Sequence, residues 1–273
     1  MPVRAVFFDA GETLVHPHPS FPDLFAETLR TQGYDVSPET VRERGHVVFD
    51  RFRSAAQAND LWTTSPERSR RFWHDVYRDF VAELGIADAD ELLDILYGTF
   101  TDLANYRAFE DVPAVLERLR DAGLVLGVVS NFEEWLERLL EELGVRSYFS
   151  VAVVSGVEGV EKPDPRIFHL AMERVGVTPE ASVYVGDNPE FDVDPALEAG
   201  MYPVLLDRRE RFPDAPEPRI TSMIELPALL GVASWPTSAC TPWRRPTRSC
   251  PICASGSSGS ATLGRFFSGR PSS

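Results

Sequence analysis

The feature that most constrains this sequence is a series of short apolar runs separated by longer amphipathic stretches. The runs are rich in Val, Leu and aromatic residues and lack the strict polar–apolar alternation of a strand with one face in water. This composition is typical of strands that are buried on both faces of a parallel sheet. The predicted strands are 4–9 (RAVFFD), 124–130 (LVLGVVS), 151–154 (VAVV), 182–187 (SVYVGD) and 202–207 (YPVLLD).

Amphipathic helices are predicted between these strands, so strands and helices alternate along the second half of the chain. Parallel strands joined by helices require right-handed crossovers, which place helices on both faces of the sheet. The sequence therefore predicts an α/β fold with three layers. The predicted helices are 112–123, 133–144, 165–176 and 194–200.

A long segment without strand signals interrupts this alternation after the first strand. Residues 16–107 contain helix starts at Ser37 and Ser65, where a serine precedes a proline and an acidic residue. The aromatic residues of 62–109 are expected to form the cap core rather than a ligand-binding box. We therefore predict a helical domain at 16–107, inserted into an α/β domain made of 1–15 and 108–232.

Composition excludes several functions for the folded part of the chain. The net charge is −15 and the pI is about 4.8, which argues against nucleic acid or an anionic membrane as partner. The longest apolar run, 124–129, is far shorter than the ~20 residues that span a bilayer. The N-terminus lacks the pattern of a signal peptide, so a cytoplasmic location is expected.

The last forty or so residues differ from the rest. Residues 233–273 are rich in Ser, Pro, Gly and Arg, show no periodicity, and are predicted to be disordered. All three cysteines, Cys240, Cys250 and Cys253, lie here. Zinc usually needs four ligands, and this segment offers neither histidine nor carboxylate to complete a site. The tail is therefore not expected to carry the function.

Chemically active side chains follow the predicted strands. Asp9 ends the first strand, Ser130 and Asn131 end the second, and Lys162 follows the third. Asp187 ends the fourth strand, and Asp192 comes five residues later. The carboxyl ends of parallel strands meet at one edge of a sheet, where ligands bind. These side chains are therefore expected to converge at one site.

Lys162 is the only lysine among the 27 lysine and arginine residues of the chain. An ammonium group is a compact point charge on a flexible stem, whereas a guanidinium group is a broad planar fork. The composition favours arginine everywhere else, which suggests that the chemistry at position 162 requires lysine.

Four segments resemble the conserved motifs of the haloacid dehalogenase superfamily of hydrolases. In chain order they are FFDAGETL, VVSN, KPDPRIF and VGDNPEFDVDPALEAGM. The resemblance covers about 1–230 and is greatest to the phosphatase branches. It implies a Rossmann-like core with an inserted helical cap, which agrees with the domains predicted above.

The resemblance also implies a set of roles. Asp9 would attack phosphorus and form an aspartyl-phosphate. Asp9, Asp187 and the backbone carbonyl of Gly11 would bind Mg²⁺, with Asp192 either a further ligand or a support behind the ligands.

The remaining motif residues would hold the substrate. Ser130 and the amides that follow it would bind phosphate oxygens, and Asn131 would orient the substrate. Lys162 would pair with Asp9 and with the transferred phosphoryl group. The expected partner is a small phosphorylated metabolite; neither its identity nor the oligomeric state is evident from the sequence.

The first motif departs from the family pattern at one position. Phosphatases of this family usually carry an Asp two residues after the nucleophile, where it protonates the leaving group. This chain has Gly11 there, followed by Glu12. Loss of a general acid typically costs about 10²–10⁴-fold in rate. Glu12, a cap residue or water would have to replace it.

Three functions therefore remain open. The first is a Mg²⁺-dependent phosphohydrolase with a replacement for the acid. The second is a 2-haloacid dehalogenase, whose halide leaving group needs no proton, although such enzymes have no use for an acidic metal loop. The third is a catalytically weak binding or regulatory protein on the same scaffold.

Overall fold

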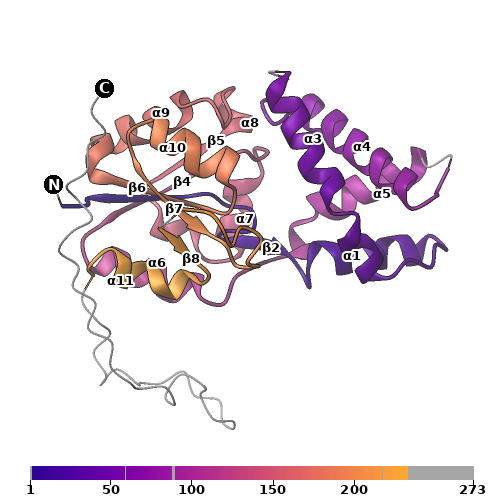
Figure 1. The fold of residues 1–273 in the computed structure, drawn as a ribbon, viewed down its shortest axis with the longest axis horizontal. Coiled ribbons are helices and arrows are strands. Elements are labelled where there is room, and N and C mark those ends of the chain that lie inside the picture. The colour runs from indigo at the N-terminus through magenta and orange to yellow at the C-terminus, as the bar shows by residue number, and fades with distance from the viewer. Residues whose placement is uncertain (1, 59, 88–89, 217, 233–273) are drawn as a thin grey trace, which may run out of the picture. The chain divides into compact units, whose positions relative to one another are not determined.

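The computed structural model describes residues 2–58, 60–87, 90–216 and 218–232, and the predicted disordered tail lies outside them. A six-stranded sheet forms the centre of the fold (Figure 1), with the order β5-β4-β1-β6-β7-β8 and parallel pairing throughout. All five predicted strands are confirmed. The strands are β1 (Ala5–Phe8), β4 (Val125–Ser130), β5 (Val151–Val154), β6 (Ser182–Gly186), β7 (Tyr202–Leu206) and β8 (Arg219–Ile220).

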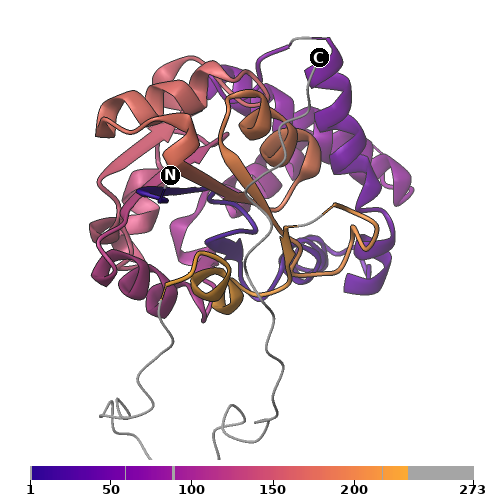
Figure 2. The ribbon, with the colours of Figure 1, turned by 60° about the vertical axis from the view of Figure 1, so that its left-hand side comes forward.

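Helices cover both faces of this sheet, which confirms the three-layer α/β prediction (Figures 1 and 2). One face packs against α6 (Val112–Asp121), α7 (Leu136–Glu142) and α11 (Leu226–Leu229). The other packs against α9 (Arg166–Val175) and α10 (Asp194–Glu198). The four-residue helix α8 (Ser155–Glu158) follows β5 directly.

The central strand shows why its sequence reads as a continuous apolar run. Val6 and Phe8 belong to the cluster on one face, whereas Ala5 and Phe7 belong to the cluster on the other. All four residues are fully buried. Since neighbouring side chains of a strand point to opposite faces, a strand covered on both sides must be apolar at every position.

A helical cap is inserted between β1 and α6. A short antiparallel pair, β2 (Val15–Pro17) and β3 (Tyr106–Ala108), forms its two connections to the core. Neither strand nor β8 was predicted, because these strands have two or three residues and are partly polar. The cap helices are α1 (Phe21–Thr31), α2 (Pro38–Glu43), α3 (His46–Gln57), α4 (Pro66–Glu83) and α5 (Asp90–Thr101).

The cap has its own hydrophobic core and well-defined helix starts. Ser37 and Ser65 both cap a helix, since each side chain accepts a hydrogen bond from a backbone N–H in the first turn, as the sequence predicted. Aromatic rings dominate the core, and Phe25, Tyr77 and Phe80 are almost completely buried. Core and cap belong to one compact unit, 1–234, and the predicted residue boundaries between them remain a prediction.

Among the described residues, none of the helices combines the length and the apolar character that crossing a bilayer requires.

Candidate active site

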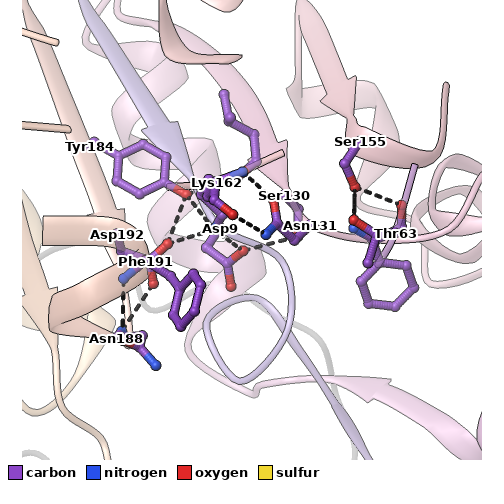
Figure 3. A network of polar contacts seen from close by, with 12 residues as sticks. Asp9, Thr63, Ser130, Asn131, Ser155, Lys162, Tyr184, Asn188, Phe191 and Asp192 are labelled. Carbon is purple, nitrogen blue, oxygen red and sulfur yellow. Dashed lines mark hydrogen bonds and ion pairs between the residues drawn. The ribbon is translucent and has the colours of Figure 1, made fainter. Parts of the chain in front are cut away.

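The order of the strands brings the predicted site residues together. β1 lies between β4 and β6, so Asp9 is flanked by the ends of the strands that lead to Ser130 and Asp187. The loop after β5 contributes Lys162, and a short helical turn after β6, Pro189–Val193, contributes Asp192. Figure 3 shows Asp9, Ser130, Lys162 and Asp192 pointing toward one another.

Lys162 lies at the centre of this group. Its Nζ donates to Oδ1 of Asp9 at 2.8 Å and to Oδ1 of Asp192 at 2.5 Å. The residue is only 3% exposed. A buried ammonium ion needs paired carboxylates and hydrogen-bond acceptors in place of water. The pairing of Lys162 with Asp9 that the sequence suggested is therefore present, and Asp192 is a second partner.

Tyr184 is a further member of the group that the sequence analysis missed. Its hydroxyl lies 3.0 Å from Nζ of Lys162 and 3.1 Å from Oδ1 of Asp192, and it donates to the backbone carbonyl of Val129 at 2.8 Å. Tyr184 lies in the buried strand β6, where an aromatic residue is predicted to belong to the hydrophobic core. No local signal in the sequence distinguishes it.

Gly186 makes room for Asp192. A Cβ atom at position 186 would lie 2.3 Å from Cγ of Asp192, far closer than van der Waals contact allows. One oxygen of Asp192 accepts from the backbone N–H of Asn188 at 2.9 Å, while the other contacts Lys162. Both oxygens of Asp192 are thus used within the protein.

Ser130 and Asn131 have different roles in the geometry. The Ser130 hydroxyl donates to Oδ1 of Asp9 at 2.9 Å. The Asn131 amide instead bonds to the backbone of Lys162, accepting from its N–H and donating to its carbonyl, both at 2.7 Å. Asn131 therefore fixes the position of the lysine loop, and its amide already has partners before any substrate binds.

Burial and neighbouring charges shift the pKa values in this group. Burial raises the pKa of Asp9, and Asp192 adds to this effect, although Lys162 opposes it. Burial alone would lower the pKa of Lys162, but Asp192 and Asp9 together raise it. Burial and the charge of Asp192 raise the pKa of Asp187 to about 8, despite its ion pair with Arg211 at 2.6 Å.

The three aspartates have the composition of a site for a hard cation. Asp9, Asp187 and Asp192 each offer an oxygen, and these oxygens lie within 4.8 Å of one another. Carboxylate oxygens are the protein ligands that Mg²⁺ prefers. A divalent cation would also offset the repulsion that raises the pKa of Asp187. The residues present therefore fit Mg²⁺.

The position of the missing acid is open space. A Cβ atom added to Gly11 would meet no other atom within 4 Å. Glu12 does not fill this space, because its carboxylate accepts from Arg209 at 2.6 Å. Its backbone has a φ of 56°, a left-handed conformation that is uncommon for residues other than glycine.

The site opens into a cavity of about 1030 Å³ between core and cap. Three glutamates of the core bind donors from the cap near this cavity. Glu161 accepts from the loop before α4, and Glu133 accepts from Ser69 at 2.7 Å and from Tyr97 at 3.0 Å. Glu190 pairs with Arg53 at 3.0 Å on the surface. None of these contacts was predicted from the sequence.

The Glu161 contact is the most completely buried of the three. Its carboxylate accepts from the backbone N–H of Trp62 at 3.0 Å and of Thr63 at 2.8 Å, and from the Thr63 hydroxyl at 2.6 Å. That hydroxyl also contacts Ser155 of the core (Figure 3). Glu161 is 2% exposed, and burial raises its pKa even though these hydrogen bonds favour the charged form.

This combination of a parallel α/β core, a helical cap and acids at the strand ends defines a class of capped hydrolases. The family model of haloacid dehalogenase-like hydrolases matches residues 3–200. The chain belongs to this family.

Relatives and solved structures agree with the assignment. Haloacid dehalogenase-like hydrolase domain-containing protein 3 of Danio rerio is 30% identical over 84% of this chain and 97% of its own length. Glyceraldehyde 3-phosphate phosphatase of Methanopyrus kandleri is 41% identical over 80% of this chain and 88% of its own length. The magnesium-bound HAD-hydrolase YfnB of Bacillus subtilis shares the fold, with a TM-score of 0.69, 17% identity and coverage of 85% of this chain and 100% of YfnB.

We predict that Glu161→Gln destabilises the protein. The substituted amide has one acceptor oxygen, so at least one buried backbone N–H at Trp62 or Thr63 would lose its partner. Such a loss costs about 1–3 kcal/mol, or roughly 2–10 °C in melting temperature for a domain of this size. Differential scanning calorimetry would measure it, with the exposed Glu117→Gln as control. Equal melting temperatures for the two variants would show that the contact contributes little.

Proposed function

We propose that this protein is a Mg²⁺-dependent phosphohydrolase that acts on a phosphorylated small molecule through an aspartyl-phosphate. The observation that carries the proposal is the Lys162 ammonium group, held between Asp9 and Asp192 at the edge of a large cavity. The phosphatase among the relatives supports the same reaction class. A cytoplasmic location and the absence of a nucleic-acid partner stay predictions from the sequence.

Asp9 is the proposed nucleophile. Ser130 and Lys162 both donate to its Oδ1, which fixes the carboxylate and leaves Oδ2 for the attack on phosphorus. A bond forms between this oxygen and phosphorus, while the bond from phosphorus to the leaving oxygen breaks. Water then attacks phosphorus, releases phosphate and regenerates the carboxylate.

Lys162 and Ser130 are the proposed phosphate-binding groups. Their donors lie beside Asp9 and would offset negative charge on the transferred group. Asn131 acts indirectly in this proposal, by holding the Lys162 backbone. Tyr184 acts on the other side of the lysine, where its hydroxyl limits the movement of the ammonium group.

The proposed Mg²⁺ ligands are Asp9, Asp187 and the Gly11 carbonyl. Asp192, whose oxygens bond to Lys162 and Asn188, would chiefly hold these two residues in position rather than bind the ion itself. When bound, Mg²⁺ would neutralise charge as two anions approach each other. Arg211 now neutralises part of the Asp187 charge and would have to share it with the ion.

The proposal predicts a metal requirement that depends on pH. Chelation with EDTA should abolish phosphatase activity, and excess Mg²⁺ should restore it. In the metal-free protein the pKa of Asp187 is raised to about 8, so below that pH Mg²⁺ must displace a proton. The affinity for Mg²⁺ should therefore weaken up to about tenfold per pH unit as the pH falls below 8, and level off above it.

Titration calorimetry at several pH values would measure this affinity. A pH-independent affinity between 6 and 8 would contradict the assignment of Asp187 as a ligand. Turnover of 2-haloacids that persists in EDTA would favour a dehalogenase. Absence of turnover with every ester and haloacid would favour a binding protein.

We also predict a steep dependence on the leaving group. Within the described part of the chain, no acidic side chain occupies the space beside Gly11. Esters whose leaving oxygen departs as a stable anion should therefore react much faster than alkyl phosphates. In Gly11→Asp the new Cβ atom meets no other atom within 4 Å. The substitution should raise kcat/KM for alkyl phosphates by about 10²-fold or more and flatten the dependence.

The measurement is a series of phosphate esters with graded leaving-group acidity, on wild type, Gly11→Asp and Glu12→Gln. A flat series in wild type that becomes steep in Glu12→Gln would identify Glu12 as the acid. The ion pair of Glu12 with Arg209 leads us to expect little change in the slope for that variant.

Lys162→Arg should lose most of its activity although the charge is kept. The planar guanidinium group is too broad for a buried space in which Nζ contacts oxygens at 2.8 and 2.5 Å. We expect kcat/KM to fall by about 10²-fold or more, consistent with misplacement of a catalytic group. Arg166→Lys, an exposed exchange at the start of α9, is the control and should retain activity. Near-normal turnover of Lys162→Arg would refute the explanation for the single lysine.

A further inference from the structure

The cavity between core and cap has an unusual aromatic surface. Aromatic rings line much of it, and we refer to five of them as the aryl wall: Phe49, Phe52, Trp62, Trp73 and Phe191. The sequence analysis assigned the cap aromatics after residue 61 to the cap core. That assignment describes Phe80, which is completely buried and does not line the cavity, but Trp62, Trp73 and Tyr77 do line it.

Four rings of the aryl wall, Phe52, Trp62, Trp73 and Phe191, form a connected group that joins the cap to the core. The Phe52 ring lies 5.7 Å from that of Trp62, 5.8 Å from that of Trp73 and 6.1 Å from that of Phe191. Trp62 and Phe191 meet edge to face at 5.6 Å. These separations are typical of aromatic pairs in contact.

Phe191 places the aryl wall next to the candidate catalytic residues. It precedes Asp192, which contacts Lys162, and Lys162 contacts Asp9. Figure 3 shows the Phe191 ring beside these residues. A ligand whose phosphoryl group lies at Asp9 therefore has aromatic surface close to its organic part.

Part of this aromatic surface is not covered by other residues of the protein. Phe49 is 37% exposed, and Phe52, Trp73 and Phe191 are half-buried. Apolar surface left in contact with water favours a ligand that covers it. The volume of about 1030 Å³ is also far more than a three-carbon phosphate fills.

Two acidic side chains of the cavity already accept hydrogen bonds from the protein. Glu133 already accepts from Ser69 and Tyr97, and Asp23 accepts from Ser20. A sugar needs acceptors and donors that are free to pair with its hydroxyl groups. The aryl wall instead offers flat, apolar contact.

The open space at Gly11 independently favours a substrate with an aromatic leaving group. With no acid at that position, the leaving oxygen must depart without a proton from the protein. A phenolate is a far more stable anion than an alkoxide. Aryl phosphates therefore have both the better leaving group and the ring that fits the aryl wall.

We propose, on the basis of the phosphohydrolase function above, that the substrates are phosphate esters of aromatic hydroxyl groups, bound with the ring against the aryl wall. Asp9 forms a bond to phosphorus, and the bond from phosphorus to the aryl oxygen breaks. The electron pair leaves on that oxygen as a phenolate. Water then supplies the oxygen that releases phosphate, and its proton passes to solvent or to the phenolate.

The test compares 2-naphthyl phosphate, phenyl phosphate and acetyl phosphate with Mg²⁺ present. The first two have leaving groups of similar acidity but different apolar size, and acetyl phosphate is an activated substrate without a ring. We expect kcat/KM to be about tenfold higher for the naphthyl than for the phenyl ester, mainly through KM. Naphthylmethylphosphonate should likewise inhibit more strongly than methylphosphonate, which reports binding without turnover.

Two variants test the wall itself. Phe52→Leu and Trp73→Leu keep apolar volume but remove a ring, and each should reduce the ratio of kcat/KM for the naphthyl ester to that for the phenyl ester about fivefold or more. Tyr34→Leu is the matched control, because Tyr34 packs against the same cap cluster but does not line the cavity. Its naphthyl preference should equal that of wild type.

The outcomes separate this inference from the proposed function. Turnover of acetyl phosphate without any preference for aryl esters would overturn the inference and leave the phosphohydrolase function intact. A preference for sugar or nucleoside phosphates would do the same. Failure of all esters, with Mg²⁺ present, would overturn the proposed function itself.

Discussion

The buried ion group of Lys162, Asp9 and Asp192 is the interaction on which the site depends. Away from water, each charge requires its partner, and loss of one partner from a buried pair typically costs about 3–5 kcal/mol. The contacts at 2.8 and 2.5 Å therefore fix the end of β1, the loop after β5 and the turn after β6 relative to one another. Tyr184 and Asn131 reinforce the lysine from its side chain and from its backbone.

The same edge of the sheet also holds the cap. Glu133, Glu161 and Glu190 lie in the segments that follow three different core strands, and each binds a donor from the cap. Glu161 immediately precedes Lys162, so the loop that supplies the ammonium group also anchors Trp62 and Thr63. One loop thus contacts both Asp9, through Lys162, and the cap, through Glu161. A displacement of the cap would therefore act directly on the loop that carries the lysine.

Gly11 is the point at which this chain departs from the phosphatases that it resembles. The structure leaves open space beside it, and Glu12 is held by Arg209. With Asp9 as the proposed nucleophile and no acid at position 11, the proposed reaction is restricted in the leaving groups that it accepts. The aromatic cavity fits that restriction, since rings that carry a hydroxyl group are both apolar and good leaving groups. Family membership defines the scaffold and the reaction class, whereas these two local features narrow the substrate.

The sequence by itself determined five of the six strands of the main sheet, the α/β layers, the cap helix starts at Ser37 and Ser65, and the convergence of Asp9, Ser130, Lys162, Asp187 and Asp192. It could do so because these depend on local periodicity and on one topological rule: strand ends of a parallel sheet share an edge. Only the tertiary structure decided which atoms meet there. The Glu161 contact joins residues 98 positions apart, Tyr184 reads as an ordinary strand residue, and the direction of Glu12 depends on Arg209 far along the chain. Such contacts depend on side-chain direction and on how the cap packs on the core, and neither leaves a periodic signal in the sequence.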